Sequence, residues 1–168
     1  MIRFATEQDV KAIVEIYNDA ILHTTAVYKY ELESIEERLA WLHQKAQDNF
    51  PVLVFEDEGE VAGFATYGPF RLYPAYRYTI ENSVYVHPDH VRKGIASKLM
   101  KALIDHAEHA GYKTIIACID ATNDASIVMH EKFGFTKSGI IENAGYKFDK
   151  WLHLALYQLQ LTGPSDPK

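Results

Sequence analysis

Hydrophobic and polar positions recur along this chain in two rhythms, which predict where its helices and strands lie. Helices are expected where apolar residues return at helical spacing, over 5–22, 34–47, 92–111 and 123–134. Strands are expected where β-branched and aromatic residues run together, at 2–5, 78–86, 113–119, 136–142 and 145–161, with a hairpin over 51–68. This order predicts an α/β (α+β) domain with a mixed sheet and helices on both faces.

Local signals support several of these boundaries. Thr6 is placed to cap the first helix, and the pair Ser34 and Glu37 has the spacing of a capping box. Gly111 and Gly134 are placed to end the third and fourth helices. We expect one domain over 1–162 and a flexible tail over 163–168, where "TGPSDPK" favours no regular structure.

Composition and charge narrow the class of protein. A chain of 168 residues with 48% apolar residues can bury one core, and its formal net charge of −6 argues against general nucleic-acid binding. No apolar run is long enough for a signal peptide or a membrane span, so a cytoplasmic protein without a membrane partner is expected. The eight histidines show no zinc-site spacing, and no metal is expected.

Cys118 is the only cysteine of the chain, so a disulfide framework is excluded. It lies inside the apolar run "TIIACI", and no neighbour in the sequence would lower its pKa. We therefore expect a small buried side chain rather than a nucleophile.

A junction between a strand and a helix carries the first chemical signal, in "SVYVHPDHVRKGIASKLM". Arg92, Lys93 and Gly94 stand at the start of the helix, where unpaired N–H groups attract phosphate and glycine lets the backbone approach a ligand. The same residues also suit an exposed loop with solvated cations. Walker A and Rossmann glycine patterns are absent from the chain.

Other residues are ambiguous when each is taken alone. Glu81, in the middle of a strand, faces either solvent or a cleft, and Asn123 is most simply a helix cap. His130 fits the core or the surface equally well. The segment "GPFRLYPAYRYT" combines arginines with aromatic rings, which suits either a pocket for a small anion or an exposed loop.

Together these segments resemble the GNAT N-acetyltransferase superfamily, which uses acetyl-CoA, over nearly the whole chain. "VYVHPDHVRKGIASKLM" looks like its pyrophosphate motif, and "NDASIVMHEKFGF" like the helix beside the pantetheine arm. "YNDAILHTTAVY", "YTIENSVYV" and "AGYKFDKWLHLALYQL" are similar to the phosphinothricin and methionine sulfoximine (or sulfone) acetyltransferase branch. The resemblance implies a mostly antiparallel sheet of about seven strands.

The resemblance also implies site residues. Glu81 would be the general base for the substrate ammonium, and His130 a candidate proton donor to the leaving CoA thiolate. Acetyl-CoA would lie against a strand, a loop and two helices, through Tyr85, Val86, His87, Arg92, Lys93, Gly94, Ile95, Ala96, Ser97, Asn123 and Lys132. The amino-acid substrate would lie against the loop residues Arg71, Tyr73, Pro74, Ala75, Tyr76 and Arg77.

Four positions depart from the resembled pattern. Val91 replaces a residue that is often Gln or Arg, and Ala96 replaces the last glycine of the loop. Phe148 stands where the phosphinothricin enzymes have histidine, and His153 where the methionine sulfoximine relatives have an acid. The first pair bears on cofactor affinity and the second pair on the choice of substrate.

The expected reaction is direct acetyl transfer from acetyl-CoA to the amine of a small amino acid or analogue, without a covalent enzyme intermediate. Two other functions fit the same residues. One is an acetyltransferase for a protein terminus, a lysine or a polyamine, and the other is a CoA-binding module without turnover. The branch resemblance further implies a homodimer.

Overall fold

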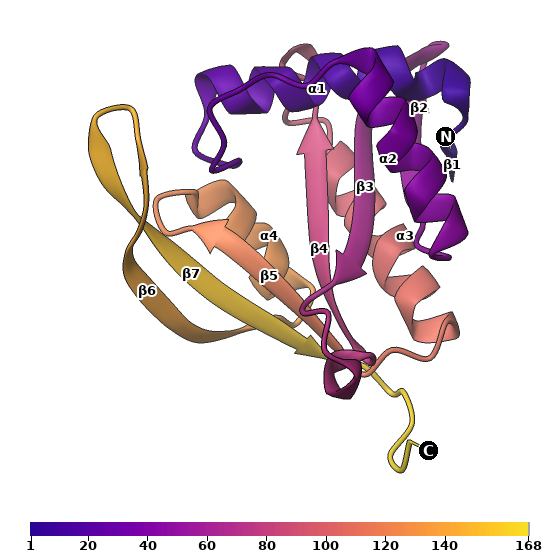
Figure 1. The fold of residues 1–168 in the computed structure, drawn as a ribbon, viewed down its shortest axis with the longest axis vertical. Coiled ribbons are helices and arrows are strands. Elements are labelled where there is room, and N and C mark those ends of the chain that lie inside the picture. The colour runs from indigo at the N-terminus through magenta and orange to yellow at the C-terminus, as the bar shows by residue number, and fades with distance from the viewer. Residues whose placement is uncertain (168) are drawn as a thin grey trace.

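The computed structural model describes residues 1–167. Its strands are β1 (Ile2–Phe4), β2 (Val52–Asp57), β3 (Glu60–Pro69), β4 (Thr79–Val86), β5 (Thr114–Asp120), β6 (Thr136–Lys147) and β7 (Lys150–Gln160). They form one seven-stranded sheet in the order β1-β2-β3-β4-β5-β7-β6 (Figure 1). Only β4 and β5 pair in parallel, and every other pair is antiparallel. The predicted fold class is confirmed.

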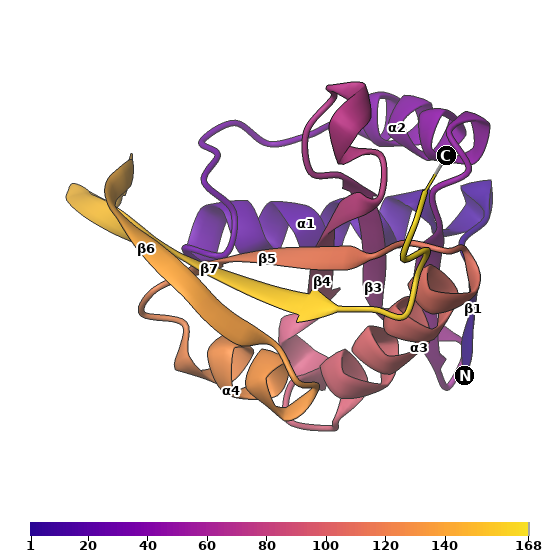
Figure 2. The ribbon, with the colours of Figure 1, turned by 90° about the horizontal axis from the view of Figure 1, so that it is seen from below.

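Helices cover both faces of this sheet (Figure 2). The four are α1 (Val10–His23), α2 (Ile35–Gln47), α3 (Ile95–His109) and α4 (Asp124–Lys132). The first two lie on one face and the last two on the other. Short 3-10 turns occur at Glu7–Asp9, Pro74–Tyr76 and Pro88–His90.

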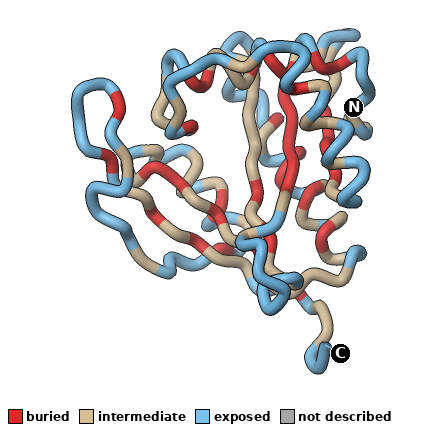
Figure 3. Tube along the Cα trace, viewed as in Figure 1, coloured by how far each residue is buried: buried red, intermediate tan, exposed pale blue. Residues whose placement is uncertain are grey.

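The main core lies between α3 and the sheet. Leu99, Met100 and Leu103 of α3 are almost fully buried and pack with Ile80 and Ile115 of the central strands. A second cluster on the opposite face joins α1 to β2 and β3. Because each face is covered, the middle of β3 is buried along most of its length (Figure 3).

Some boundaries differ from the sequence-based prediction. The Ser34–Glu37 capping box is present, but Thr6 leads into the turn Glu7–Asp9 before α1 begins. α3 begins at Ile95 rather than at 92, because Arg92 and Gly94 have positive φ angles, which an α-helix does not contain.

The prediction of a single strand over 145–161 was wrong. Residues 145–147 end β6, and the chain turns at Phe148 and Asp149, whose φ angles are 54° and 58°. Two consecutive left-handed residues make the tight turn that matches the twist of a hairpin. Residues that favour strands continue on both sides of this turn. The sequence pattern therefore gave no sign that one strand ends and another begins there.

The last described residues of the chain have no regular structure. β7 ends at Gln160, and residues 163–167 form neither helix nor strand, while the last residue of the predicted tail, Lys168, lies outside the described residues. Within 1–167, no helix has the length and apolarity that a membrane crossing needs.

β1 is joined to the start of α1 by a partly buried ion pair. Arg3 donates to Asp9 at 2.8 and 2.9 Å, and the same carboxylate accepts the backbone N–H of Thr6 at 2.7 Å. The Arg3 hydrogen bonds, helped by Thr6 and opposed by burial, hold the pKa of Asp9 below its usual value. Such a carboxylate stabilises the fold above its unfolded pKa, and the contribution is lost as pH falls through the lowered folded pKa.

We therefore expect Asp9→Asn to lower the free energy of unfolding at pH 7 by about 2 kcal/mol, the scale for hydrogen bonds to a charged group. The cost should be smaller at pH 3, below the ordinary aspartate pKa of 3.8, because the unfolded wild-type chain binds a proton there that folded Asp9 resists. Urea unfolding at the two pH values measures this. Asp105→Asn, which breaks an exposed pair with Lys101, is the matched control and should cost under about 0.5 kcal/mol. An equal Asp9→Asn cost at both pH values would contradict the linkage.

Candidate active site

The parting of β4 and β5 creates the site. They pair only at Thr79–Thr114, Ile80–Ile115 and Glu81–Ile116. Beyond Glu81, β4 stays paired with β3, and β5 stays paired with β7. The wedge between them is therefore held from both sides.

The edge of β4 that borders the wedge carries backbone groups without a strand partner. His87 donates its backbone N–H to Ala62 of β3, and alternate residues of a strand turn these groups to opposite edges. Val84 and Val86 therefore present their N–H and C=O groups to the edge that β5 has left. Such groups need partners, and an extended, amide-containing ligand can supply them.

A trough follows this edge. Its outer part, about 300 Å³, reaches from Val86 to Val91 and Ala96 at the start of α3. Its inner part, about 90 Å³, reaches Asn82, Cys118 and His130. Both parts are lined by the same set of residues at their junction, namely Ala26, Val84, Tyr85, Asn123, Ser126 and Met129.

The outer end of the trough meets an anion-binding turn. Arg92 and Gly94 have φ angles of 65° and 73°, and Gly94 caps α3 in the left-handed conformation. Alternating left-handed residues before a helix turn several N–H groups toward one point, where the helix dipole also favours an anion. The backbone geometry of this junction therefore supports the predicted phosphate site, in addition to its two cationic side chains.

Some of the residues that were predicted to bind the cofactor line the trough, and others do not. Ile95 is 3% exposed, so only its backbone can reach a ligand, and the backbone N–H of His87 is already used within the sheet. Asn123 lines the trough while its side chain caps α4 through Ser126. Arg92, Lys93, Ser97 and Lys132 are exposed, and none of these four residues lines the trough.

Glu81 lies on the α1 and α2 side of the sheet. It opposes Gly68 of β3, and its Oε1 accepts a hydrogen bond from Cys118 Sγ at 2.8 Å. Glu81 is half-buried and lies on β4 between Ile80, which lines the hollow described below, and Asn82, which lines the inner part of the trough. Its partial burial and its bond to Cys118 argue against a fully solvated carboxylate.

Cys118 differs from the small buried side chain that we expected. It is half-buried, lines the trough and donates to Glu81. Burial, reinforced by the Glu81 carboxylate, raises the pKa of Cys118 to about 12. The thiol is therefore protonated near neutral pH, which makes it a poor nucleophile and a stable hydrogen-bond donor.

His130 is 4% exposed and belongs to a buried relay. Its Nδ1 is 2.7 Å from the Ser126 carbonyl, which can only accept, so Nδ1 carries the proton. Burial lowers the pKa of His130, opposed by the Ser126 carbonyl, and favours the neutral ring. Its Nε2 then accepts from Asn82 Nδ2 at 3.1 Å. The only ring proton points into α4, which argues against His130 as a proton donor to the trough.

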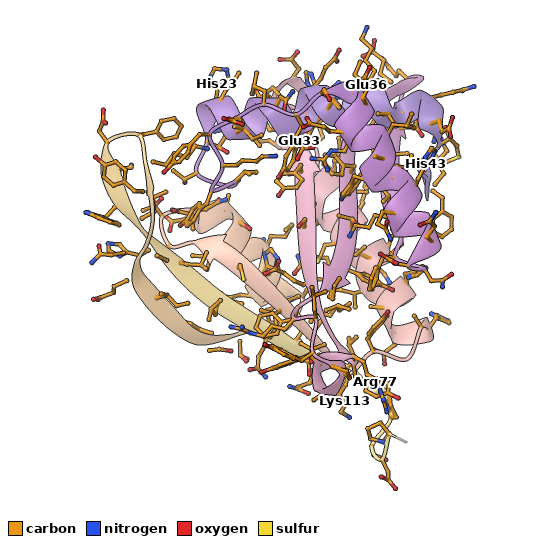
Figure 4. All side chains as sticks on the ribbon, in the orientation of Figure 1. His23, Glu33, Glu36, His43, Arg77 and Lys113 are labelled. Carbon is orange, nitrogen blue, oxygen red and sulfur yellow. The ribbon has the colours of Figure 1, made fainter. Side chains whose placement is uncertain are left out.

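The arginine and tyrosine loop lies at the other end of β4. Arg71, Tyr73, Pro74, Tyr76 and Arg77 line a hollow of about 400 Å³ that reaches Thr79 and Ile80, directly before Glu81. Ala75 is exposed and does not line it. Figure 4 shows Arg77 at this end of the molecule, near Lys113.

Sequence reasoning missed the segment that closes the wedge, residues 24–33 between α1 and α2, which we call the strap. Lys147 is 5% exposed and donates to the carbonyl oxygens of Thr24 and Val27 at 2.8 and 2.7 Å. Its ammonium thus replaces water for two carbonyls of the strap. A lysine at an inward-facing position of a strand is the feature of the sequence that could have indicated this contact.

A second anchor joins the strap to β5. Tyr28 donates its hydroxyl to the buried Asp120 at 2.7 Å. Its ring lies against Gly145, where a Cβ atom would come within 2.6 Å of Tyr28 Cδ2. Only glycine at 145 lets the ring approach so closely, and Ala26 of the strap is thereby held against the trough.

Comparison with known proteins identifies this arrangement. Residues 2–156 match the family model described as the acetyltransferase (GNAT) domain. The chain belongs to the GNAT acetyltransferase family. This membership confirms the resemblance seen in the sequence, and GNAT acetyltransferases use acetyl-CoA as co-substrate.

Individual members are close to this chain along its length. It is 43% identical to the L-methionine sulfoximine/L-methionine sulfone acetyltransferase of Salmonella typhimurium, over 99% of this chain and 97% of that protein. It is 36% identical to the phosphinothricin N-acetyltransferase of Streptomyces viridochromogenes, over 99% and 91%. The structure of yncA from Salmonella typhimurium with its cofactor acetyl-CoA aligns with a TM-score of 0.97 and 43% identity, over 100% of this chain and 97% of that one.

The site of this GNAT enzyme fits acetyl-CoA. The left-handed turn before α3 suits the pyrophosphate, and the open edge of β4 offers partners to the amides of the pantetheine arm. The trough, lined by Val84, Val86 and Met129 among others, suits the aliphatic parts of that arm. The thioester supplies the activated acetyl group when it is bound.

The high pKa of Cys118 predicts slow alkylation. At pH 8 iodoacetamide should label the native protein at least about 100-fold more slowly than the urea-unfolded chain, because the thiolate fraction is far smaller. Mass spectrometry of the labelled protein measures both rates, and Cys118→Ser, which removes the only cysteine, is the blank. Equal native and unfolded rates would contradict the buried, protonated thiol.

Proposed function

We propose that this GNAT enzyme transfers acetyl from acetyl-CoA to the α-amine of a free amino acid of the methionine sulfoximine, methionine sulfone or phosphinothricin kind, with Glu81 as general base. The observation that supports Glu81 is its partial burial on β4 between Asn82, which lines the trough, and Ile80, which lines the hollow of the arginine and tyrosine loop. The relatives named above, which act on such amino acids, support the choice of acceptor.

The amine must lose a proton before it can attack a thioester, because an α-ammonium has no lone pair. Glu81 takes that proton, directly or through water. Its Oε1 is engaged by Cys118, which leaves Oε2 as the oxygen that accepts. General-base help of this kind contributes about 10²- to 10⁴-fold.

The substrate carboxylate is assigned to the arginine and tyrosine loop. Arg71 lies over Phe70, with 5.5 Å between the guanidinium carbon and the ring centroid. Arg77 lies at 5.0 Å over Tyr78 in the same way. A guanidinium held by a ring keeps its planar donors in place for a carboxylate. This assignment favours a free amino acid over a polyamine, which has no carboxylate to bind.

We expect Glu81→Gln to reduce kcat/KM at least about 100-fold, because the amide cannot accept the proton. Its acetyl-CoA affinity should stay within about twofold of the wild type. Release of CoA thiol with methionine sulfoximine, methionine sulfone, phosphinothricin, spermidine and a lysine peptide measures turnover, and calorimetry measures binding.

Glu36→Gln, at an exposed position on α2 (Figure 4), is the matched control and should leave both quantities unchanged. Undiminished turnover in Glu81→Gln would reject the base, and turnover only on spermidine or the peptide would reject the acceptor. Acetyl-CoA binding without turnover on any amine would instead favour a non-catalytic module.

We also propose a homodimer in the cytoplasm, where acetyl-CoA is used and a lone thiol stays reduced. The β6–β7 hairpin exposes a run of large apolar side chains at sheet-edge positions, namely Ile140, Ile141, Tyr146, Phe148 and Trp151. Apolar surface of this kind at a sheet edge favours association, and the branch resemblance suggests a second copy as the partner.

The dimer predicts a sedimentation mass of roughly twice the 19.2 kDa of one chain. Trp151→Asp, at a position that is 61% exposed, should shift the protein to monomer. Phe4→Asp, on β1 at the opposite edge of the sheet, is the exposed apolar control and should leave the mass unchanged. A wild type that sediments as one chain at every concentration would reject the dimer.

A further inference from the structure

A second hollow, of about 730 Å³, lies at the β1 edge of the sheet, and we call it the edge hollow. It is bordered by α2 on one face of the sheet, with His43 and Lys45, and by α3 on the other face, with His106. It shares no lining residue with the trough, and Phe50 alone lines both it and the hollow of the arginine and tyrosine loop. The edge hollow is therefore distinct from the site of acetyl transfer.

The walls of the edge hollow are mainly apolar, and include Phe4, Leu42, Phe50, Pro51 and Val52. Phe4 is 59% exposed, and its ring meets the His106 ring edge-on with 5.9 Å between the centroids. The volume lies within the range of about 300–1,000 Å³ that is usual for small-molecule sites, which are apolar with a few polar groups. An apolar or aromatic ligand would remove this open surface from water.

The charged side chains of the edge hollow are not all paired. Glu7 and His43 bind each other, with 2.6 Å between Oε1 of the first and Nε2 of the second. Lys45 donates to the backbone carbonyl of Tyr67 at 2.8 Å, but no carboxylate within residues 1–167 forms an ion pair with it. The Lys45 ammonium is therefore a positive charge that the protein leaves without a counter-charge in contact.

This ammonium lies beside the wall of the edge hollow. It is 5.5 Å from the centre of the Phe50 ring, which lines the hollow, and 5.7 Å from that of the Trp41 ring. Partial burial, reinforced by the charge of Arg38 and opposed by that of Asp48, lowers the pKa of Lys45 to about 8. A cation that burial disfavours is stabilised when an anion comes into contact with it.

We propose that the edge hollow binds an aromatic carboxylic acid, whose carboxylate pairs with the Lys45 ammonium and whose ring packs against Phe4 and Phe50. One negative charge on the ligand matches the one unpaired ammonium of the hollow, and aromatic walls favour an aromatic body. The proposal does not depend on Glu81 or on the identity of the acetyl acceptor, so its test is independent of the proposed function.

The probe is 2-naphthylacetate, and 2-naphthylacetamide is its matched neutral partner with the same rings. An acid of this size should bind with a Kd of about 1 mM, the affinity usual for a small ligand. In ¹H–¹⁵N NMR titrations at pH 7, the amide signals of Phe4, Ala46 and Val52, which line the edge hollow, should shift. The neutral amide should bind at least about fivefold more weakly, because it cannot pair with the ammonium.

Three variants separate the charge from the cavity. Lys45→Met keeps the apolar stem, and should weaken binding of the acid at least about fivefold while binding of the neutral amide stays within about twofold. Ala46→Trp, at an exposed position that lines the edge hollow, fills it and should abolish binding of both probes. Lys101→Met removes an exposed lysine of α3, and is the matched control that should change neither affinity.

The pH dependence of binding tests the charge in the wild type, without any substitution. Affinity for the acid should fall at least about fivefold between pH 7 and pH 9.5, as Lys45 loses its proton near pH 8, while affinity for the neutral amide stays constant. The other titratable groups that line the edge hollow are Glu7, His43 and His106. His106 is neutral over this range, because burial lowers its pKa.

Several outcomes would overturn the proposal. Equal binding of the acid and the neutral amide at pH 7 would show that the ammonium is not the partner. Acid affinity that stays constant up to pH 9.5 would show the same, even where Lys45→Met fails to fold. Signals of the edge hollow that stay in place up to about 10 mM acid, or shifts confined to the trough, would show that the edge hollow is not a binding site.

Discussion

β4 and β5 pair for three residues and then separate, and the site of this GNAT enzyme depends on that separation. Neither strand is loose, because β3 holds β4 and β7 holds β5 along their lengths. The sheet therefore keeps an internal edge whose backbone groups are available to a ligand. Glu81 lies on one side of this edge and Asn82 on the other, because successive residues of a strand face opposite sides of the sheet.

The strap closes the wedge, and polar contacts with distant parts of the chain hold the strap in place. Lys147 ties two carbonyls of the strap to the β6–β7 hairpin, and Tyr28 ties the strap to Asp120 at the end of β5. The pKa of Asp120 is lowered despite its burial, because hydrogen bonds from Thr122, Tyr28 and Thr25 outweigh the cost of removing the charge from water. The same hairpin carries the exposed apolar run, so the proposed dimer contact and the acceptor side of the wedge share one element.

Electrostatics in the site work through hydrogen bonds more than through net charge. The chain is acidic as a whole, yet the turn before α3 has left-handed residues whose backbone N–H groups suit an anion, with Arg92 and Lys93 exposed there. Cys118 and His130 both stay neutral, since burial raises the pKa of the first and lowers that of the second. Each then acts through the direction of one proton, the thiol toward Glu81 and the imidazole toward Ser126.

The sequence by itself determined the succession of helices and strands, the capping box at Ser34 and the strand–turn–helix junction at Gly94, because each depends on neighbours in the chain. It also placed Glu81 on the face opposite Asn82. It could not show the parting of β4 from β5, the contact of Cys118 with Glu81, or the burial of Lys147 against the strap. The last two contacts join residues 37 to 123 positions apart, and only the packed sheet brings them within hydrogen-bonding distance.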